Sequence, residues 1–246
     1  MFSGSRSVVF CFCYNGFMRQ NIEQPFIQTL LEVPAIWIVS DIGYNLLLPI
    51  LGIGSSDDNH PFLITAYYVF WIAVVLINFW GFYKQWKAID VRPSMFMLVL
   101  FGIFGIILYL LYILPFFPPI HWASSWKPPS ALLLTASQWY FLPLTIEIAL
   151  QQLLVAAMVL AFNAQKFSLQ TISYWSAGLF GSIHLLLVFN GSSFAYVAVF
   201  TVSAIVAGFI FPYLLLRVRN GFIYTYFLHW GFYAVVTVLA RVLLVA

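Results

Sequence analysis

Three side chains that can carry acid–base chemistry lie inside long apolar stretches of this sequence: Glu147, His184 and His229. An ionisable side chain placed in hydrocarbon is costly unless it faces a polar interior, so such residues indicate a functional site. A carboxylate held near an imidazole can deprotonate a water molecule, and a second imidazole can donate a hydrogen bond to a developing oxyanion. The three residues therefore predict chemistry by an activated water molecule.

The composition is that of an integral membrane protein. Hydrophobic residues make up 63% of the 246 residues and charged residues only 7%, whereas soluble domains carry roughly a quarter charged residues. Aromatic residues reach 20%, which is typical of lipid-facing and interfacial positions. The bilayer is therefore the first expected partner, and no nucleic-acid partner is expected.

The apolar residues form stretches of the length that a membrane helix needs, which is about 20 residues. Their continuity excludes the alternating strands of a membrane β-barrel. We predict an all-α, polytopic bundle of about seven transmembrane helices, at roughly 28–53, 61–83, 93–117, 131–162, 171–189, 194–216 and 221–245.

The basic residues predict how this bundle is oriented. Side A is the side that holds the N-terminus, and side B is the opposite side. Eight of the ten Lys and Arg residues fall on side A and only Lys127 falls on side B, so we expect side A, and with it the N-terminus, to be cytoplasmic. The tenth, Arg241, lies inside the last helix near its side-B end, where we expect it to snorkel outward. At about 1.5 Å per residue, the three candidate residues are expected in one layer roughly 12 to 22 Å below the cytoplasmic face.

Each candidate residue has a neighbour four positions away, on the same face of its helix. These neighbours are Gln151 for Glu147, Phe180 for His184 and Tyr233 for His229. Gln152 lies about 100° further around the fourth helix than Gln151.

Two further residues bear on the site. Pro143, four residues before Glu147, is expected to kink the fourth helix and open room for water. Asp41, deep in the first helix, is a rival acidic residue that we expect to line a second polar path.

The order and spacing of these residues resemble the CAAX protease and bacteriocin-processing family of intramembrane glutamic endopeptidases. That family shows a paired-glutamate motif, EExxxR, a few residues after a proline, then FxxxH and later HxxxN. The matching stretches lie within about residues 140–240 and read Pro143-Leu-Thr-Ile-Glu147-Ile-Ala-Leu-Gln151-Gln152, Phe180-Gly-Ser-Ile-His184 and His229-Trp-Gly-Phe-Tyr233.

The resemblance implies an intramembrane endopeptidase that cleaves a peptide or a membrane-protein segment entering from the cytoplasmic side. Glu147 would be the general base, and His184 and His229 would assist it or bind the oxyanion. Gln151 or Gln152, together with Tyr233, would support them, and the sequence leaves open which glutamine takes the family's basic position. No organic cofactor is implied. A glutamate and two histidines are zinc ligands in principle, but a metal is not favoured.

The hydropathy pattern and the resemblance together predict the membrane in which the protein lies and the division of the chain into segments. We expect the bacterial inner (cytoplasmic) membrane. Residues 1–27 would be a short cytoplasmic or interfacial segment, 28–130 the N-terminal transmembrane helices, and 131–246 the catalytic-type transmembrane domain.

The chain departs from the family pattern at three positions. Only one glutamate of the pair is present, the basic position holds a glutamine, and Tyr233 stands where the family has asparagine. These departures support an alternative, a non-catalytic relative with an immunity or scaffold role. A third hypothesis is a haem protein that uses His184 and His229 as axial ligands; it leaves Glu147 unexplained and would be recognised by a Soret absorption band.

Overall fold

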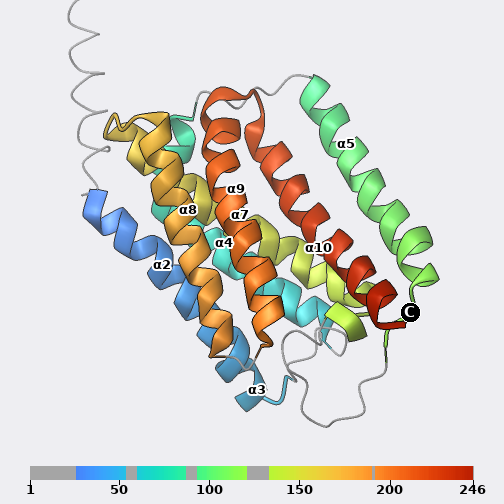
Figure 1. Cartoon of the computed structure of the whole chain (residues 1–246). Coiled ribbons are helices and arrows are strands. Elements are labelled where there is room, and N and C mark those ends of the chain that lie inside the picture. Colours follow the sequence, from blue (N-terminus) through green and yellow to red (C-terminus); the bar gives the residue numbers. More distant parts are fainter. Residues whose placement is uncertain (1–25, 54–59, 87–92, 121–132, 190–191, 246) are drawn as a thin grey trace, which may run out of the picture.

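The computed structural model describes residues 26–53, 60–86, 93–120, 133–189 and 192–245, with side chains described to residue 243. It confirms an all-α bundle: the described ranges contain no strand, and seven helices are long and apolar enough to cross a membrane (Figure 1). These spans are Phe26–Ile50, Pro61–Lys84, Pro93–Phe116, Gln138–Ala164, Leu169–Val188, Phe194–Arg217 and Gly221–Leu243. The expected interfacial segment 1–27 lies almost wholly outside the described residues.

Helix α7 (Phe141–Ala164) is the central helix of the bundle. Its most apolar window is 72% buried, whereas that of the span containing α5 (Pro93–Leu108) is 11% buried. Helices α2 (Phe26–Ile42), α4 (Pro61–Lys84), α8 (Leu169–Leu185), α9 (Phe194–Arg217) and α10 (Gly221–Val245) all contact α7. Side chains on α7 can therefore meet side chains from every one of these helices.

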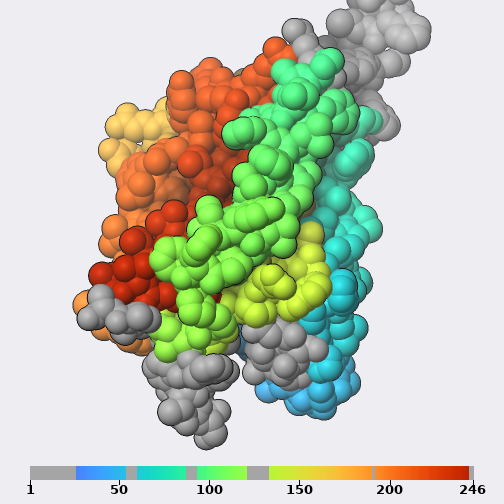
Figure 2. Space-filling model, turned by 90° about the vertical axis from the view of Figure 1, so that its right-hand side faces the viewer, coloured from blue at the N-terminus to red at the C-terminus, as the bar shows by residue number. Residues whose placement is uncertain are grey.

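Helix α5 lies at the edge of the bundle. It contacts α10 and runs along one face of the molecule (Figures 1 and 2). Where the two helices meet, Gly102 of α5 lies against the ring of Phe227 of α10. Because α5 buries so little of its surface, it contributes nothing to the candidate site described below.

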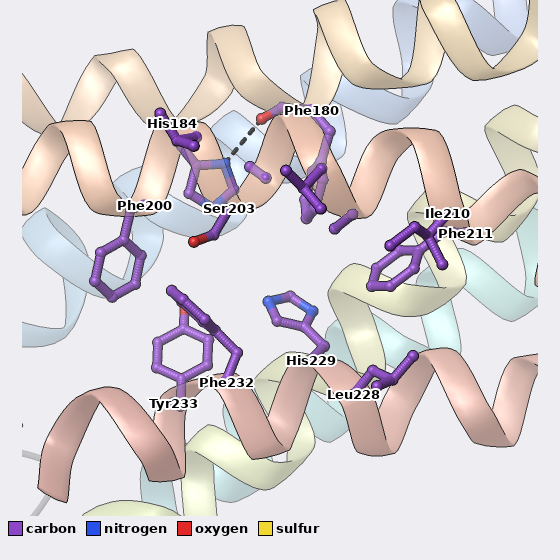
Figure 3. Close-up of a pocket in the computed structure, with 14 residues that line it drawn as sticks. Phe180, His184, Phe200, Ser203, Ile210, Phe211, Leu228, His229, Phe232 and Tyr233 are labelled. Atoms are coloured by element: carbon purple, nitrogen blue, oxygen red, sulfur yellow. Dashed lines mark hydrogen bonds between the residues drawn. The ribbon is translucent and has the colours of Figure 1, made fainter. Parts of the chain in front are cut away.

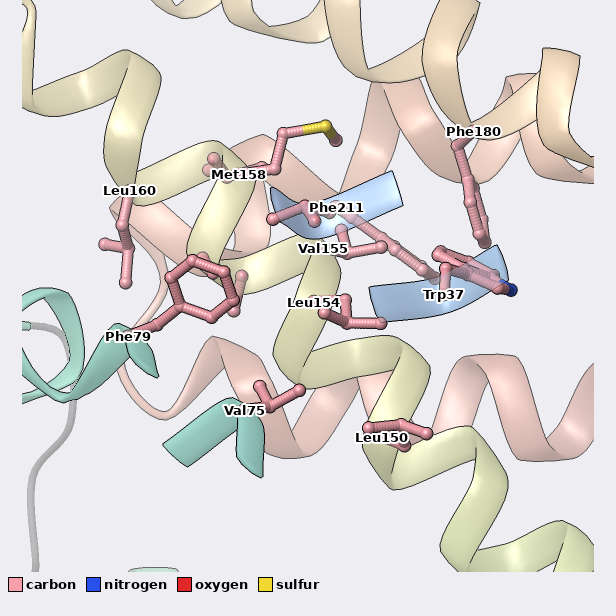
Figure 4. Packing of buried hydrophobic residues seen from close by; sticks show 14 of the residues in the cluster. Trp37, Val75, Phe79, Leu150, Leu154, Val155, Met158, Leu160, Phe180 and Phe211 are labelled. Carbon is pink, nitrogen blue, oxygen red and sulfur yellow. The ribbon is translucent and has the colours of Figure 1, made fainter. Parts of the chain in front are cut away.

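The main core joins the first two spans to the last four. Trp37 of α2, Phe79 of α4, Leu154 of α7 and Phe180 of α8 are all buried in one hydrophobic cluster (Figure 4). The ring centroids of Trp37 and Phe180 lie 5.9 Å apart. Segments 28–130 and 131–246 thus share this core.

Helices α8 and α9 pack closely because small residues line their contact. A Cβ atom added at Gly208 of α9 would overlap the backbone of Ala177 of α8, and one at Gly181 would meet the side chain of Ile205. Small residues are how membrane helices approach each other closely, since apolar side chains gain little by leaving lipid. This packing fixes α8, and so His184, against α9.

The fourth membrane helix begins later than expected. A short helical turn covers residues 133–135, and the chain then leaves the helix at Ala136 and Ser137. The Ser137 hydroxyl accepts a hydrogen bond from the backbone N–H of Trp139, 3.1 Å away, and so caps a new start. Pro143 consequently lies in the first turn of α7 rather than mid-helix, where a proline is tolerated and need not kink the helix as expected.

Arg241 does not snorkel outward as expected. Its side chain is 2% exposed and donates to the backbone carbonyls of Phe117 at 2.5 Å, Leu133 at 3.3 Å and Ala136. Carbonyl groups at helix ends lack partners within their helix, and the guanidinium offers five N–H donors in a fixed fork. Arg241 therefore ties α10 to two other chain segments at the side-B end of the bundle.

Replacing Arg241 with Leu should destabilise the protein, because it leaves buried carbonyl groups without donors. We expect the free energy of unfolding to fall by about 2–4 kcal/mol, and Arg241→Lys should recover only part of this, since an ammonium lacks the fork. Thermal unfolding in detergent, followed by circular dichroism, measures the effect. The control is Arg217→Leu, which removes an exposed arginine. Equal midpoints for both leucine variants would contradict the assigned role.

Candidate functional site

A polar cavity of about 130 Å³ lies where five membrane helices meet. Its polar lining is Asp41 of α2, Glu147 and Gln151 of α7, His184 of α8, Tyr196 of α9 and Tyr233 of α10. These six residues define what we call the polar cavity. Such a group of polar side chains inside an apolar bundle is the arrangement expected of a functional site in a membrane.

A second, apolar cavity of about 310 Å³ adjoins it between α8, α9 and α10 (Figure 3). Phenylalanine and aliphatic side chains make up most of its wall, and His184, His229, Tyr233 and Ser203 are its polar members. His184, Phe200 and Tyr233 line both cavities. The structure thus places Glu147 and His184 on the polar cavity, and His184 and His229 on the apolar one.

His184 is positioned by its own helix. Its Nδ1 atom lies 2.8 Å from the backbone carbonyl oxygen of Phe180, one turn earlier (Figure 3). A carbonyl oxygen only accepts, so Nδ1 carries the proton, and in the neutral ring Nε2 is left with a lone pair. His184 therefore offers a proton acceptor. The FxxxH spacing matters here because residue i − 4 supplies the carbonyl.

His229 is positioned from another helix. Its Nδ1 atom lies 2.8 Å from the side-chain nitrogen of Gln152, and both residues are buried. With the Gln152 amide in this orientation Nδ1 accepts, so the neutral ring carries its proton on Nε2. The ring extends from α10 into the apolar cavity (Figure 3). His229 is therefore a hydrogen-bond donor, the opposite of His184.

Phe180 packs between the two imidazoles. Its ring centroid lies 4.9 Å from that of His184 and 5.9 Å from that of His229, edge-on in both cases. Its side chain is 3% exposed. Phe180 thus supports His184 with its carbonyl group and both rings with its side chain.

The two glutamines bind different residues of the site, Gln151 the carboxylate and Gln152 an imidazole. The Gln151 amide donates to a carboxylate oxygen of Glu147 at 2.9 Å, whereas Gln152 contacts His229. Of the two glutamines, Gln151 is the one that shares a helix face with Glu147. Gln152 points about 100° away, toward α10.

Asp41 lines the same cavity as Glu147, so the expected second polar path is wrong. Helix α2 contacts α7 directly, which brings the two carboxylates to one space. The backbone around Asp41 is held by Tyr67, whose hydroxyl donates to the Ser40 carbonyl at 2.7 Å, and by Asn45, whose amide donates to the Asp41 carbonyl at 2.9 Å. The π-helix Gly43–Leu47 follows at once, and such turns are frequent at functional sites.

Sequence reasoning missed several residues that line the polar cavity, among them Trp37 and Tyr196. Tyr196 is in the first turn of α9, where its backbone N–H donates to the Ser193 cap, and Trp37 is one turn before Asp41. In a chain with 9 Trp and 14 Tyr residues, neither stands out by type. The spacing of Trp37 to Asp41, four residues on one helix face, is the one hint that the sequence carried.

The polar cavity lies nearer side B than expected. Glu147 is nine residues after Gln138 and seventeen before Ala164, and His184 is four residues before Val188. At 1.5 Å per residue this puts Glu147 about 14 Å from the side-B end of its span and about 25 Å from the other. His229, eight residues after Gly221, lies in the side-A half of its span, where all three residues were expected, whereas Glu147 and His184 lie in the side-B halves of theirs.

Within the described ranges, no group of three or more His, Cys, Asp or Glu side chains is arranged to hold a metal ion. The two cavities offer groups of the protein itself for chemistry. These are a carboxylate, an imidazole that accepts, and an imidazole that donates.

The opposite tautomers of the two histidines are a testable consequence. We expect neutral His184 to carry its proton on Nδ1 and neutral His229 on Nε2, as measured by nitrogen chemical shifts in protein labelled with ¹⁵N-histidine. Gln152→Leu should change the His229 signal and leave His184 unchanged, whereas Gln151→Leu should leave His229 unchanged. Single His→Asn variants assign the signals, with exposed His60 as the control. The same tautomer at both sites would refute the assignment.

Comparison with protein-family models, with curated proteins and with solved structures gives no match to this chain. The resemblance to the CAAX protease and bacteriocin-processing family therefore stays a prediction from three motifs. The case for a functional site is carried by the two cavities and the hydrogen bonds described above.

Proposed function

We propose that this integral membrane protein is a glutamate-dependent hydrolase that cleaves a peptide bond in a membrane-associated segment. The observation that carries the proposal is that Glu147 and the acceptor imidazole His184 line one cavity, while the donor imidazole His229 lines the adjoining one. The peptide substrate is what the motif resemblance adds to this chemistry.

In the proposed reaction, Glu147 takes a proton from water and the resulting hydroxide attacks the carbonyl carbon of the scissile bond. The oxyanion that forms accepts a hydrogen bond from Nε2–H of His229. The carbon–nitrogen bond then breaks, and the leaving amine takes the proton that Glu147 holds. His184 shares the cavity and accepts hydrogen bonds from water through Nε2. Water is thereby added across one bond, with hydroxide on the acyl part and hydrogen on the amine.

Tyr233 is suited to a supporting role. It lines both cavities, and its ring lies 5.6 Å from that of His229, centroid to centroid. Its hydroxyl is a donor in the place where the family has asparagine. We infer that Tyr233 helps to hold the substrate carbonyl between the two cavities.

The non-catalytic alternative also has an observation in its favour. The residue bound to Glu147 is a neutral amide, Gln151, rather than the arginine of the family motif. A membrane immunity or scaffold role would keep the fold without needing the charge. A cellular phenotype that survives Glu147→Ala combined with His184→Ala would favour this alternative.

Glu147→Gln tests the enzyme proposal directly. In proteoliposomes, with a pool of quenched fluorescent peptides that include apolar segments, we expect hydrolysis to fall by about 10²–10⁴-fold, the usual contribution of a general base. The matched control is Glu32→Gln, which makes the same change on α2 at a residue that does not line either cavity. Turnover that is unchanged in Glu147→Gln, or absent from the unaltered protein, would reject the proposal.

A further inference from the structure

We propose that the polar cavity binds an organic ammonium cation, with Asp41 as its charged anchor. The ligand class covers the side chain of a lysine, a free amino terminus and a small alkylamine, which share the same head group. This site goes beyond the proposed hydrolysis, because it concerns equilibrium binding and does not need turnover.

The charge of the cavity favours a cation. Two carboxylic acids, Asp41 and Glu147, line it, and none of its described lining residues is a Lys or Arg. The Nδ1–H group of His184 already donates to the Phe180 carbonyl, so the ring offers only an acceptor to the cavity. A cation entering this space meets acceptors on α2, α7 and α8.

The walls favour an organic cation in particular. Trp37, Tyr196, Phe200 and Tyr233 line the cavity, and aromatic faces attract ammonium groups. Phe200 fixes this wall, since its ring lies 4.3 Å from that of Tyr196 and 5.6 Å from that of Tyr233, centroid to centroid. Trp37 is 6% exposed and packed against Phe180. Contacts among the aromatic rings therefore fix the positions of these side chains in the structure without a ligand.

The size and geometry argue against a bare metal ion. Asp41, Glu147 and His184 share the cavity, yet no metal-holding arrangement of such residues exists in the described ranges. The volume of about 130 Å³ exceeds that of a single water molecule, about 30 Å³, several times. A methylated or alkylated ammonium group fills such a space better than an ion that needs direct, converging ligands.

An independent observation comes from Gln151. Its side chain is 7% exposed, its nitrogen donates to Glu147, and its carbonyl oxygen has no hydrogen-bond partner among the described residues. A buried acceptor left without a donor is costly. Gln151 lines the polar cavity, and its side-chain amide must turn for this buried oxygen to accept from the N–H groups of an ammonium ligand.

Access is from the side that Asp41 occupies. Asp41 and Leu186 are the exposed members of the lining, whereas Glu147 is half-buried and bound by Gln151. An entering cation therefore reaches Asp41 first. Glu147 stays available for water, so a cationic residue of a substrate and the activated water can occupy the cavity region together.

The test is equilibrium binding to the full chain in lipid nanodiscs, by isothermal titration calorimetry. The probes are n-butylammonium and ethylammonium, with 1-butanol and potassium chloride as the uncharged and inorganic comparisons. We expect both ammonium ions to bind and the other two to give no saturable signal. Asp41→Asn should weaken ammonium binding by at least about tenfold, as expected for losing one charged hydrogen-bond partner.

Asp41→Glu keeps the charge and should bind within a few-fold of the unaltered protein, and Glu32→Gln should bind normally. Size-exclusion profiles show whether each variant is folded. If Asp41→Asn does not fold, Glu147→Gln removes the other carboxylate of the cavity and should also weaken ammonium binding. Equal binding of 1-butanol, displacement by potassium, or normal affinity in Asp41→Asn would each overturn the inference. Glu147-dependent hydrolysis without ammonium binding would reject this site and leave the proposed function standing. Ammonium binding without hydrolysis would support this site and reject the proposed function.

Discussion

The absence of hydrogen-bond partners in hydrocarbon is the constraint on which this structure depends. A polar group that the bundle buries is costly unless it finds a partner inside the protein. Arg241 binds backbone carbonyls, Gln152 binds His229, and His184 binds the carbonyl of Phe180. These bonds decide which atoms are left to face the cavities. The chemistry available to the site thus follows from how the bundle satisfies its own polar groups.

Helix α7 supplies the polar side chains around which the site forms. As the most buried span, it can present polar side chains to several neighbours at once. Gln151 and Gln152 follow each other in sequence but point to different neighbours, so one binds the carboxylate and the other the imidazole of α10. The polar and apolar cavities therefore adjoin each other, and the side chains of His184 and Tyr233 line both of them.

The seven spans were predictable because hydrophobic length is a local property. Glu147, His184 and His229 were found for the same reason: an ionisable residue in an apolar run is conspicuous without any knowledge of contacts. The start of α7 was not, since Leu133 and Leu134 continue the apolar run and only Ser137 and the carbonyl groups bound by Arg241 mark the break. The convergence of Asp41 and Tyr196 with Glu147 depends on packing between helices far apart in the sequence. No spacing within one helix predicts such a contact.

The central claim is that α2, α7, α8, α9 and α10 bring their polar residues to one place. Cross-linking tests it without any assumption about function. In a chain with Cys11→Ser and Cys13→Ser, a short bismaleimide should link Asp41→Cys to Tyr196→Cys in native membranes. The same reagent should not link Glu32→Cys to Tyr196→Cys, since Glu32 lies more than two turns away along α2 and does not line the cavity. Efficient linking of the second pair, or none of the first, would contradict the site described above.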